Sequence, residues 1–143
     1  MIRDFDAADA ESVRALLAGI PEAVQWLPQD VQASQANSVF RVVEEEGQLS
    51  GLIIFRIMAG EAEILNLAVE SRRRRQGMAS RLIEDMIVAS KAAGVKRIFL
   101  EVRDSNEAAR SFYARMGFTE VGRRRQYYRQ PAEDGLVLVR TLE

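Results

Sequence analysis

The 143-residue chain contains neither cysteine nor histidine. Without cysteine there can be no disulfide, no thiolate nucleophile and no cysteine-ligated metal. Without histidine there can be no Ser-His-Asp triad and no histidine-ligated metal. Any acid–base chemistry must therefore fall to Glu, Asp, Tyr, Lys or water. We expect no metal site in this protein.

Long apolar runs are also missing. No stretch approaches the ~20 residues that are needed to span a bilayer. The acidic opening segment, residues 1–6, lacks the apolar core of a signal peptide. Hydrophobic residues make up 48% of the chain and charged residues 29%, which is typical of a soluble globular protein. We expect one domain over residues 1–143, in the cytoplasm and without a membrane partner.

The charge is unevenly distributed, although the whole chain carries only −1. Residues 1–66 hold four arginines and 11 acidic residues, a net charge of −7. Residues 67–143 hold 16 basic and 10 acidic residues, a net charge of +6. A basic half is compatible with nucleic acid. However, the chain lacks a strand that interleaves aromatic and basic residues. A compact polyanionic ligand therefore fits better, and we expect no direct contact with nucleic acid.

The hydrophobic pattern predicts an α/β or α+β domain with a mixed sheet. Strands are expected at residues 39–44, 49–58, 61–69, 97–103, 118–121 and 136–142, with a polar loop over 122–135 before the last one. Helices are expected at residues 10–17, from about Pro28 to 36, from Gly77 to a stop at Gly94, and between a cap at Ser105 and Gly117.

The segment 66–79 joins an apolar strand to a helix through a run of arginines. Backbone N–H groups at a helix start have no partner inside the helix, and the helix dipole makes that end positive. Such a place binds phosphate, and Gly77 lets an anion approach the main chain closely. A solvated arginine face at an ordinary strand–helix joint explains these residues equally well.

Four side chains further along are candidates for chemistry or binding. Glu101 lies mid-strand among apolar neighbours, either as a functional carboxylate or as an edge residue in water or paired with Arg103. Tyr113 lies on the apolar stripe of its helix and is, viewed alone, a core tyrosine. Tyr127 and Tyr128 are adjacent aromatics in the polar loop, where they either bind a partner or pack the loop.

Three motifs in order resemble the GNAT N-acetyltransferase family over residues 47–143. The first is Arg74-x-x-Gly77-x-Ala79. The second runs from Leu100-Glu101-Val102-Arg103 through Ser105-Asn106 and Tyr113 to Gly117-Phe118. The third, Arg124-x-x-Tyr127-Tyr128 with Glu133-Asp134, resembles the RimI branch of ribosomal-protein alanine N-acetyltransferases. Residues 1–40, where part of the acceptor site lies in that family, resemble the branch poorly.

The resemblance implies a GNAT fold, in which a mixed, mostly antiparallel sheet is flanked by helices and two splayed strands form the acetyl-CoA cleft. It assigns Glu101 as general base and Tyr113 as general acid. It assigns the acetyl-CoA contacts to Leu67, Ala68, Val69, Arg74, Arg75, Gln76, Gly77, Met78, Ala79, Ser80 and Asn106. Tyr127 and Tyr128 would line the acceptor groove.

The expected activity is transfer of an acetyl group from acetyl-CoA, as co-substrate, to the N-terminal α-amine of a protein, possibly a ribosomal protein. The enzyme would be a monomer or a dimer. Three alternatives stay open from the sequence: an acetyltransferase for a small amine or an internal lysine, a non-catalytic acyl-CoA-binding or sensing module, and, more distantly, a nucleic-acid-binding domain that uses the arginine clusters.

Overall fold

The computed structural model describes residues 1–20, 38–70, 77–129 and 131–143. The elements in these ranges are β1 (Ile2–Asp4), η1 (Ala7–Asp9), α1 (Ala10–Ala18), β2 (Ser38–Glu45), β3 (Gln48–Met58), β4 (Glu61–Val69), α3 (Met78–Ala92), β5 (Arg97–Arg103), α4 (Glu107–Arg115), β6 (Thr119–Arg129) and β7 (Ala132–Thr141). The helix expected near Pro28 lies outside the described residues.

One seven-stranded sheet organises the described chain, in the order β1-β2-β3-β4-β5-β7-β6. Every neighbouring pair is antiparallel except β4 and β5, which are parallel. The two faces of the sheet have separate apolar clusters. On β2 and β3, for example, alternate residues belong to opposite clusters, as the two-residue period of a strand requires. The α+β class and the mixed sheet predicted from the sequence are confirmed.

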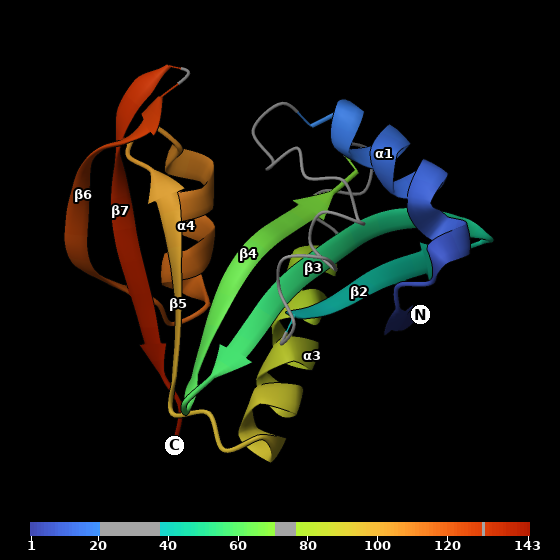
Figure 1. Ribbon diagram of the computed structural model, residues 1–143, viewed down its shortest axis with the longest axis horizontal. Coiled ribbons are helices and arrows are strands. Elements are labelled where there is room, and N and C mark those ends of the chain that lie inside the picture. The colour runs from blue at the N-terminus through green and yellow to red at the C-terminus, as the bar shows by residue number, and fades with distance from the viewer. Residues whose placement is uncertain (21–37, 71–76, 130) are drawn as a thin grey trace.

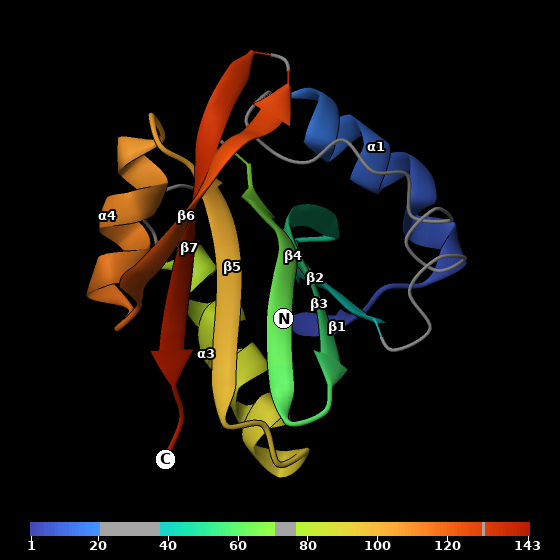
Figure 2. The same cartoon turned by 60° about the vertical axis from the view of Figure 1, so that its left-hand side comes forward.

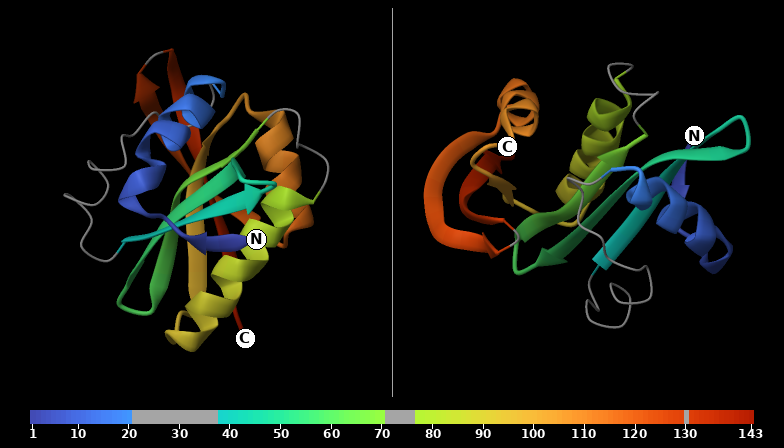
Figure 3. Two further views of the ribbon diagram at one scale, coloured as in Figure 1. Left: turned by 90° about the vertical axis from the view of Figure 1, so that its right-hand side faces the viewer. Right: turned by 90° about the horizontal axis from the view of Figure 1, so that it is seen from above.

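Helix α1 covers one face of the sheet, and α3 and α4 cover the other (Figure 3). The first face joins Val13, Leu16 and Leu17 of α1 to buried residues of β2 and β3. The second face is larger, and α3 contributes Met78, Leu82, Ile83, Met86 and Ile87 to it. These α3 residues recur at the three- and four-residue spacing of one helix face, and the helix itself was expected from the sequence. Gly94, with φ of +80°, follows the helix at the expected stop.

Strands β4 and β5 meet at one end of the molecule and diverge toward the other (Figure 1). Their ladder contains only three residue pairs, from Glu61↔Arg97 to Glu63↔Phe99. An ion pair between Glu61 and Arg97 joins the two strands at the closed end. Just beyond the last pair, the β3–β4 register shifts so that Leu65 becomes an extra residue on β4. Such a bulge bends its strand, and here it accompanies the departure of β4 from β5.

The segment 122–135 was predicted to be a polar loop, and this prediction is wrong. Strand β6 continues to Arg129 and β7 begins at Ala132, so the two form a long antiparallel hairpin at the edge of the sheet. Figure 2 shows this hairpin extending past the end of β5. Most of β6 is exposed on both faces, so its sequence lacks the apolar alternation that marks a half-buried strand.

No helix in the described ranges is long and apolar enough to cross a membrane.

Replacing Leu82 with alanine is expected to lower the free energy of unfolding by about 3 kcal/mol, because a fully buried leucine leaves a cavity when it is truncated. Val88→Ala is the matched control on the same helix, because Val88 is 70% exposed. Urea unfolding of both variants measures the difference. Equal effects of the two substitutions would contradict the packing of α3 described above.

Candidate active site

A cavity of about 290 Å³ occupies the space between the diverging strands. Its walls come from the second half of β4, from β5, from the start and inner face of α4, and from Tyr128 on β6. Glu101 and Arg103 are the charged residues among those that line it, and most of the other lining residues are apolar. The topology thus places a carboxylate from β5 and tyrosines from two further elements around one site.

Glu101 points into this cavity from the middle of β5. Its side chain is only 9% exposed, and an uncompensated buried carboxylate is unfavourable. The partner is Arg124, whose Nε lies 2.9 Å from a Glu101 carboxylate oxygen. Arg103, the partner considered from the sequence, pairs with Glu133 at 3.2 Å.

Tyr127 is a second donor to Glu101. Its hydroxyl donates a hydrogen bond to the Glu101 carboxylate, and this bond, together with burial, raises the pKa of Tyr127 to about 12. The ring packs directly on the backbone of Gly135, where an added Cβ would lie 3.1 Å from a ring carbon. A larger residue at this position would push the tyrosine ring away from its present place beside Glu101.

An irregularity in β6 accompanies the contacts of Arg124 and Tyr127 with Glu101. The ladder passes from Arg124↔Gly135 to Tyr128↔Glu133, so residues 125–127 of β6 all face Asp134 of β7. The Asp134 carboxylate holds this bulge, accepting hydrogen bonds from the Gln126 backbone N–H at 2.9 Å and from the Arg123 side chain at 3.0 Å. Bulges of this kind turn side chains away from their regular direction.

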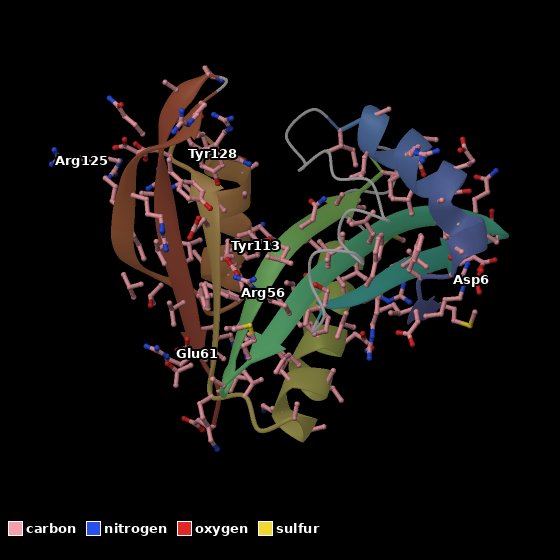
Figure 4. All side chains as sticks on the ribbon, viewed as in Figure 1. Asp6, Arg56, Glu61, Tyr113, Arg125 and Tyr128 are labelled. Carbon is pink, nitrogen blue, oxygen red and sulfur yellow. The ribbon has the colours of Figure 1, made fainter. Side chains whose placement is uncertain are left out.

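Tyr128, on β6 of the hairpin, lines the cavity (Figure 4). The Arg103 guanidinium lies over its ring, 4.3 Å from the centroid, and the Tyr127 ring meets it edge-on at 5.1 Å. Burial, and then the negative charge of Glu101, raise the pKa of the Tyr128 hydroxyl. Of the two tyrosines of the predicted acceptor groove, Tyr128 thus lines the cavity, whereas Tyr127 is 47% exposed and contacts the lining residue Glu101.

Tyr113 reaches the same cavity from α4 and lies between β5 and β4 (Figure 4). It is 6% exposed and belongs to the main apolar cluster, so it is a core tyrosine as well as a lining residue. The rings of Phe112 and Phe118 meet it edge-on at 5.1 and 5.4 Å. Burial raises the pKa of its phenol, so the hydroxyl keeps its proton at neutral pH.

The start of α3 has the features of an anion site. Gly77 precedes the helix in the left-handed conformation, with φ of +74°, and its own Cα faces open space. Among the described residues no side chain caps this helix, and the first-turn N–H groups of Met78, Ala79 and Ser80 have no partner inside it. Ala79 also lines the cavity. The predicted phosphate contacts Arg74, Arg75 and Gln76 lie outside the described residues.

The free edge of β4 and the start of α4 complete the walls. Beyond Glu63, the β4 edge with Leu67, Ala68 and Val69 faces the cavity instead of β5. An exposed strand edge of this kind can hydrogen-bond an extended chain. Asn106 lines the cavity too, but it, and not Ser105, caps α4: its side-chain oxygen accepts from the Ala109 N–H at 3.1 Å. Its amide nitrogen is the group left for a ligand.

The cavity therefore combines an extended edge for a chain-like ligand, a helix start for phosphate, and a carboxylate with two tyrosines at the far end. These features fit acetyl-CoA, whose pantetheine arm is extended and whose other end carries a pyrophosphate. In the described part of the chain, no group of three or more acidic residues is placed to hold a metal ion.

The model of the acetyltransferase (GNAT) family matches residues 8–118 of the chain. The chain belongs to the GNAT family. It is accordingly an acetyl-CoA-dependent acetyltransferase, and the predicted GNAT fold is confirmed by the sheet and its splayed strands.

Individual relatives are similar over most of their length. The chain is 37% identical over 114 residues to the [ribosomal protein bS18]-alanine N-acetyltransferase of Escherichia coli K12, a match that covers 79% of this chain and 76% of that protein. The crystal structure of the E. coli ribosomal-protein-S18-alanine N-acetyltransferase superposes with a TM-score of 0.85 at 26% identity, covering 100% and 94% of the two chains. The crystal structure of Ard1 from Thermoplasma volcanium superposes with a TM-score of 0.88 at 29% identity, covering 100% of this chain and 97% of that one.

Three features of this acetyltransferase were missed from the sequence: the partnership of Arg124 with Glu101, the bulge at Leu65, and the bulge at residues 125–127. The Arg124–Glu101 contact depends on the pairing of β6 with β7, which the loop expected at 122–135 excluded. The two bulges leave no clear mark in composition. Gly135, inside β7 and packed against Tyr127, is a usable signal, because a glycine inside a strand often marks a close approach.

Glu101→Gln is expected to lower the pKa of Tyr127 from about 12 toward its ordinary value of about 10. The cause is loss of the charged acceptor that favours the protonated phenol. The chain has three tyrosines, so phenolate absorbance near 295 nm follows each ionisation, with circular dichroism reporting the fold at each pH. Glu120→Gln, on exposed β6, is the control. An unchanged titration curve in Glu101→Gln would show that the two side chains do not interact.

Proposed function

We propose that this acetyltransferase acts on the N-terminal α-amine of a protein, with ribosomal protein bS18 as the first acceptor to test. The observation that carries the proposal is the convergence of Glu101, Tyr113 and Tyr128 on one cavity between β4 and β5. The 37% identity to an enzyme named for the bS18 alanine reaction supports the choice of acceptor.

The edge of β4 and the start of α3 would hold acetyl-CoA. Leu67, Ala68 and Val69 would hydrogen-bond the pantetheine arm as an added strand does, and the N–H groups from Gly77 to Ser80 would bind the pyrophosphate. Asn106 would contact the same molecule through its amide nitrogen. This placement directs the thioester toward the end of the cavity where Glu101 and Tyr113 lie.

The chemistry needs one base and one acid. A C–N bond forms between the amine and the acetyl carbon, and the C–S bond of the thioester breaks. Glu101 would accept the proton that the amine loses, directly or through one water, and the Tyr113 hydroxyl would give its proton to the departing sulfur. Burial keeps the Tyr113 hydroxyl protonated until that moment, because it raises the pKa of the phenol.

The decisive experiment combines free-thiol release from acetyl-CoA with mass spectrometry of the products. The acceptors are an alanine-starting peptide with the bS18 N-terminal sequence, the same peptide blocked at its α-amine but carrying lysine, and a set of small amines. The account predicts transfer to the free α-amine. Transfer only to lysine or to small amines would show that the acceptor is not a protein N-terminus. Acetyl-CoA binding without any transfer would favour a non-catalytic sensing module.

Glu101→Gln is expected to lower kcat by about 100-fold, and Tyr113→Phe by at least about tenfold, because each removes a proton-transfer group. Tyr113→Phe keeps the ring that packs on Phe112 and Phe118, so its melting temperature should stay close to that of the wild type. Steady-state assays with the alanine peptide provide the measurement. Full kcat in both variants would refute the roles assigned to these two residues.

Tyr128→Ala is expected to raise the KM for the peptide severalfold and to change acetyl-CoA affinity little, because Tyr128 lines the cavity from the hairpin. Calorimetry with acetyl-CoA and initial rates against peptide concentration separate the two effects. A reversed pattern, with weaker acetyl-CoA binding and an unchanged peptide KM, would move the hairpin out of the acceptor site.

A further inference from the structure

Glu101 does not face the cavity as a bare carboxylate. Arg124 contacts one of its oxygens at 2.9 Å, and the Tyr127 hydroxyl donates a second bond to it. Arg124 directly precedes the bulge at residues 125–127 of β6, and Tyr127 lies in it. Asp134 and Gly135 of β7 contact this bulge, Asp134 through the Gln126 N–H and Gly135 through the Tyr127 ring. The contact is therefore built into the hairpin by several separate features of the sequence.

The charges at the cavity wall balance as a result. The two charged lining residues are Glu101 and Arg103, and each has a partner of opposite sign, Arg124 and Glu133. A lone carboxylate that is 9% exposed would attract any cation that entered the cavity. The Glu101–Arg124 pair carries no net charge, and its guanidinium repels a second cation at short range.

We propose that Arg124 selects the acceptor by its protonation state: with its guanidinium on Glu101, the site admits a neutral amine and disfavours an ammonium ion. This inference rests on the proposed function, in which Glu101 accepts the proton of the attacking amine. Arg124 acts through Glu101 and is a positioning residue that determines specificity.

The selection separates two classes of protein amine. An N-terminal α-amine has a pKa near ~8, so about a tenth of it is neutral at pH 7. A lysine amine has a pKa of ~10.4, and fewer than about one in a thousand is neutral. An unpaired carboxylate would offset part of this difference by binding the lysine ammonium and then taking its proton. The Glu101–Arg124 pair removes that route and leaves the α-amine as the favoured acceptor.

Arg124→Gln tests the proposal against a matched control one residue away. Arg125→Gln removes the same charge from β6, but Arg125 points away from the molecule (Figure 4). A third variant, Arg124→Lys, keeps the positive charge. For each protein, kcat/KM is measured with the alanine peptide and with the α-blocked lysine peptide, and the melting temperature is recorded.

We expect the preference for the α-amine, as the ratio of the two kcat/KM values, to fall by about tenfold in Arg124→Gln, through loss of the repelling charge. Arg125→Gln should keep the wild-type ratio, and Arg124→Lys should restore most of it. A uniform loss with both peptides in Arg124→Gln would make Arg124 a structural support only. A rise in kcat/KM with both peptides would show that Arg124 only occupies Glu101 and is displaced by any acceptor. Either result overturns the proposal.

The same experiment separates this proposal from the proposed function. If the wild type acetylates the α-amine and the ratio does not respond to Arg124, only the selection by Arg124 is wrong. If the wild type binds acetyl-CoA but acetylates neither peptide, or acetylates lysine alone, the proposed function fails and the role of Arg124 fails with it.

Discussion

The three-pair ladder between β4 and β5 is the constraint on which the rest of the site depends. The strands are tied at their first residues and separate beyond Glu63, where the Leu65 bulge accompanies the bend of β4. If β4 and β5 paired along their whole length, their backbone groups would hydrogen-bond to each other and no cavity would be left between the strands. The separation leaves one wall of backbone groups on β4 and one wall of side chains on β5, which are the surfaces that an extended thioester ligand and an acid–base reaction require.

The β6–β7 hairpin closes the other end of the site. β7 anchors it to the molecule through its ladder with β5 and through the buried Leu136 and Leu138, whereas most of β6 is exposed and pairs only with β7. The Arg103–Glu133 ion pair adds a polar contact between β5 and the hairpin. The Asp134 carboxylate accepts the Gln126 N–H and the Arg123 side chain, which lowers the pKa of Asp134. These polar contacts on β6, together with the buried leucines of β7, hold Arg124 and Tyr127 on Glu101 and Tyr128 at the cavity.

The hydrophobic period predicted β3, β4, β5 and α3, because each has a clear buried side. Of β6 it found only the start, through the strand expected at 118–121, because the rest of this edge strand is exposed on both faces. It therefore missed Arg124, which contacts Glu101 only when the hairpin forms. The resemblance to the family motifs singled out Glu101 and Tyr113 as candidate catalytic residues. No local pattern shows that the two side chains share a cavity, which depends on the splay of the strands and on the packing of α4.

Amide hydrogen exchange with and without acetyl-CoA would test most directly whether the separation of β4 and β5 builds the acyl-CoA site. The account predicts slower exchange at Leu67–Val69 and at Met78–Ser80 when acetyl-CoA is added, with β1 and β2 unchanged. If acetyl-CoA binds while these amides exchange as before, the ligand does not lie along the β4 edge and the start of α3, and the assignment of the cavity is wrong.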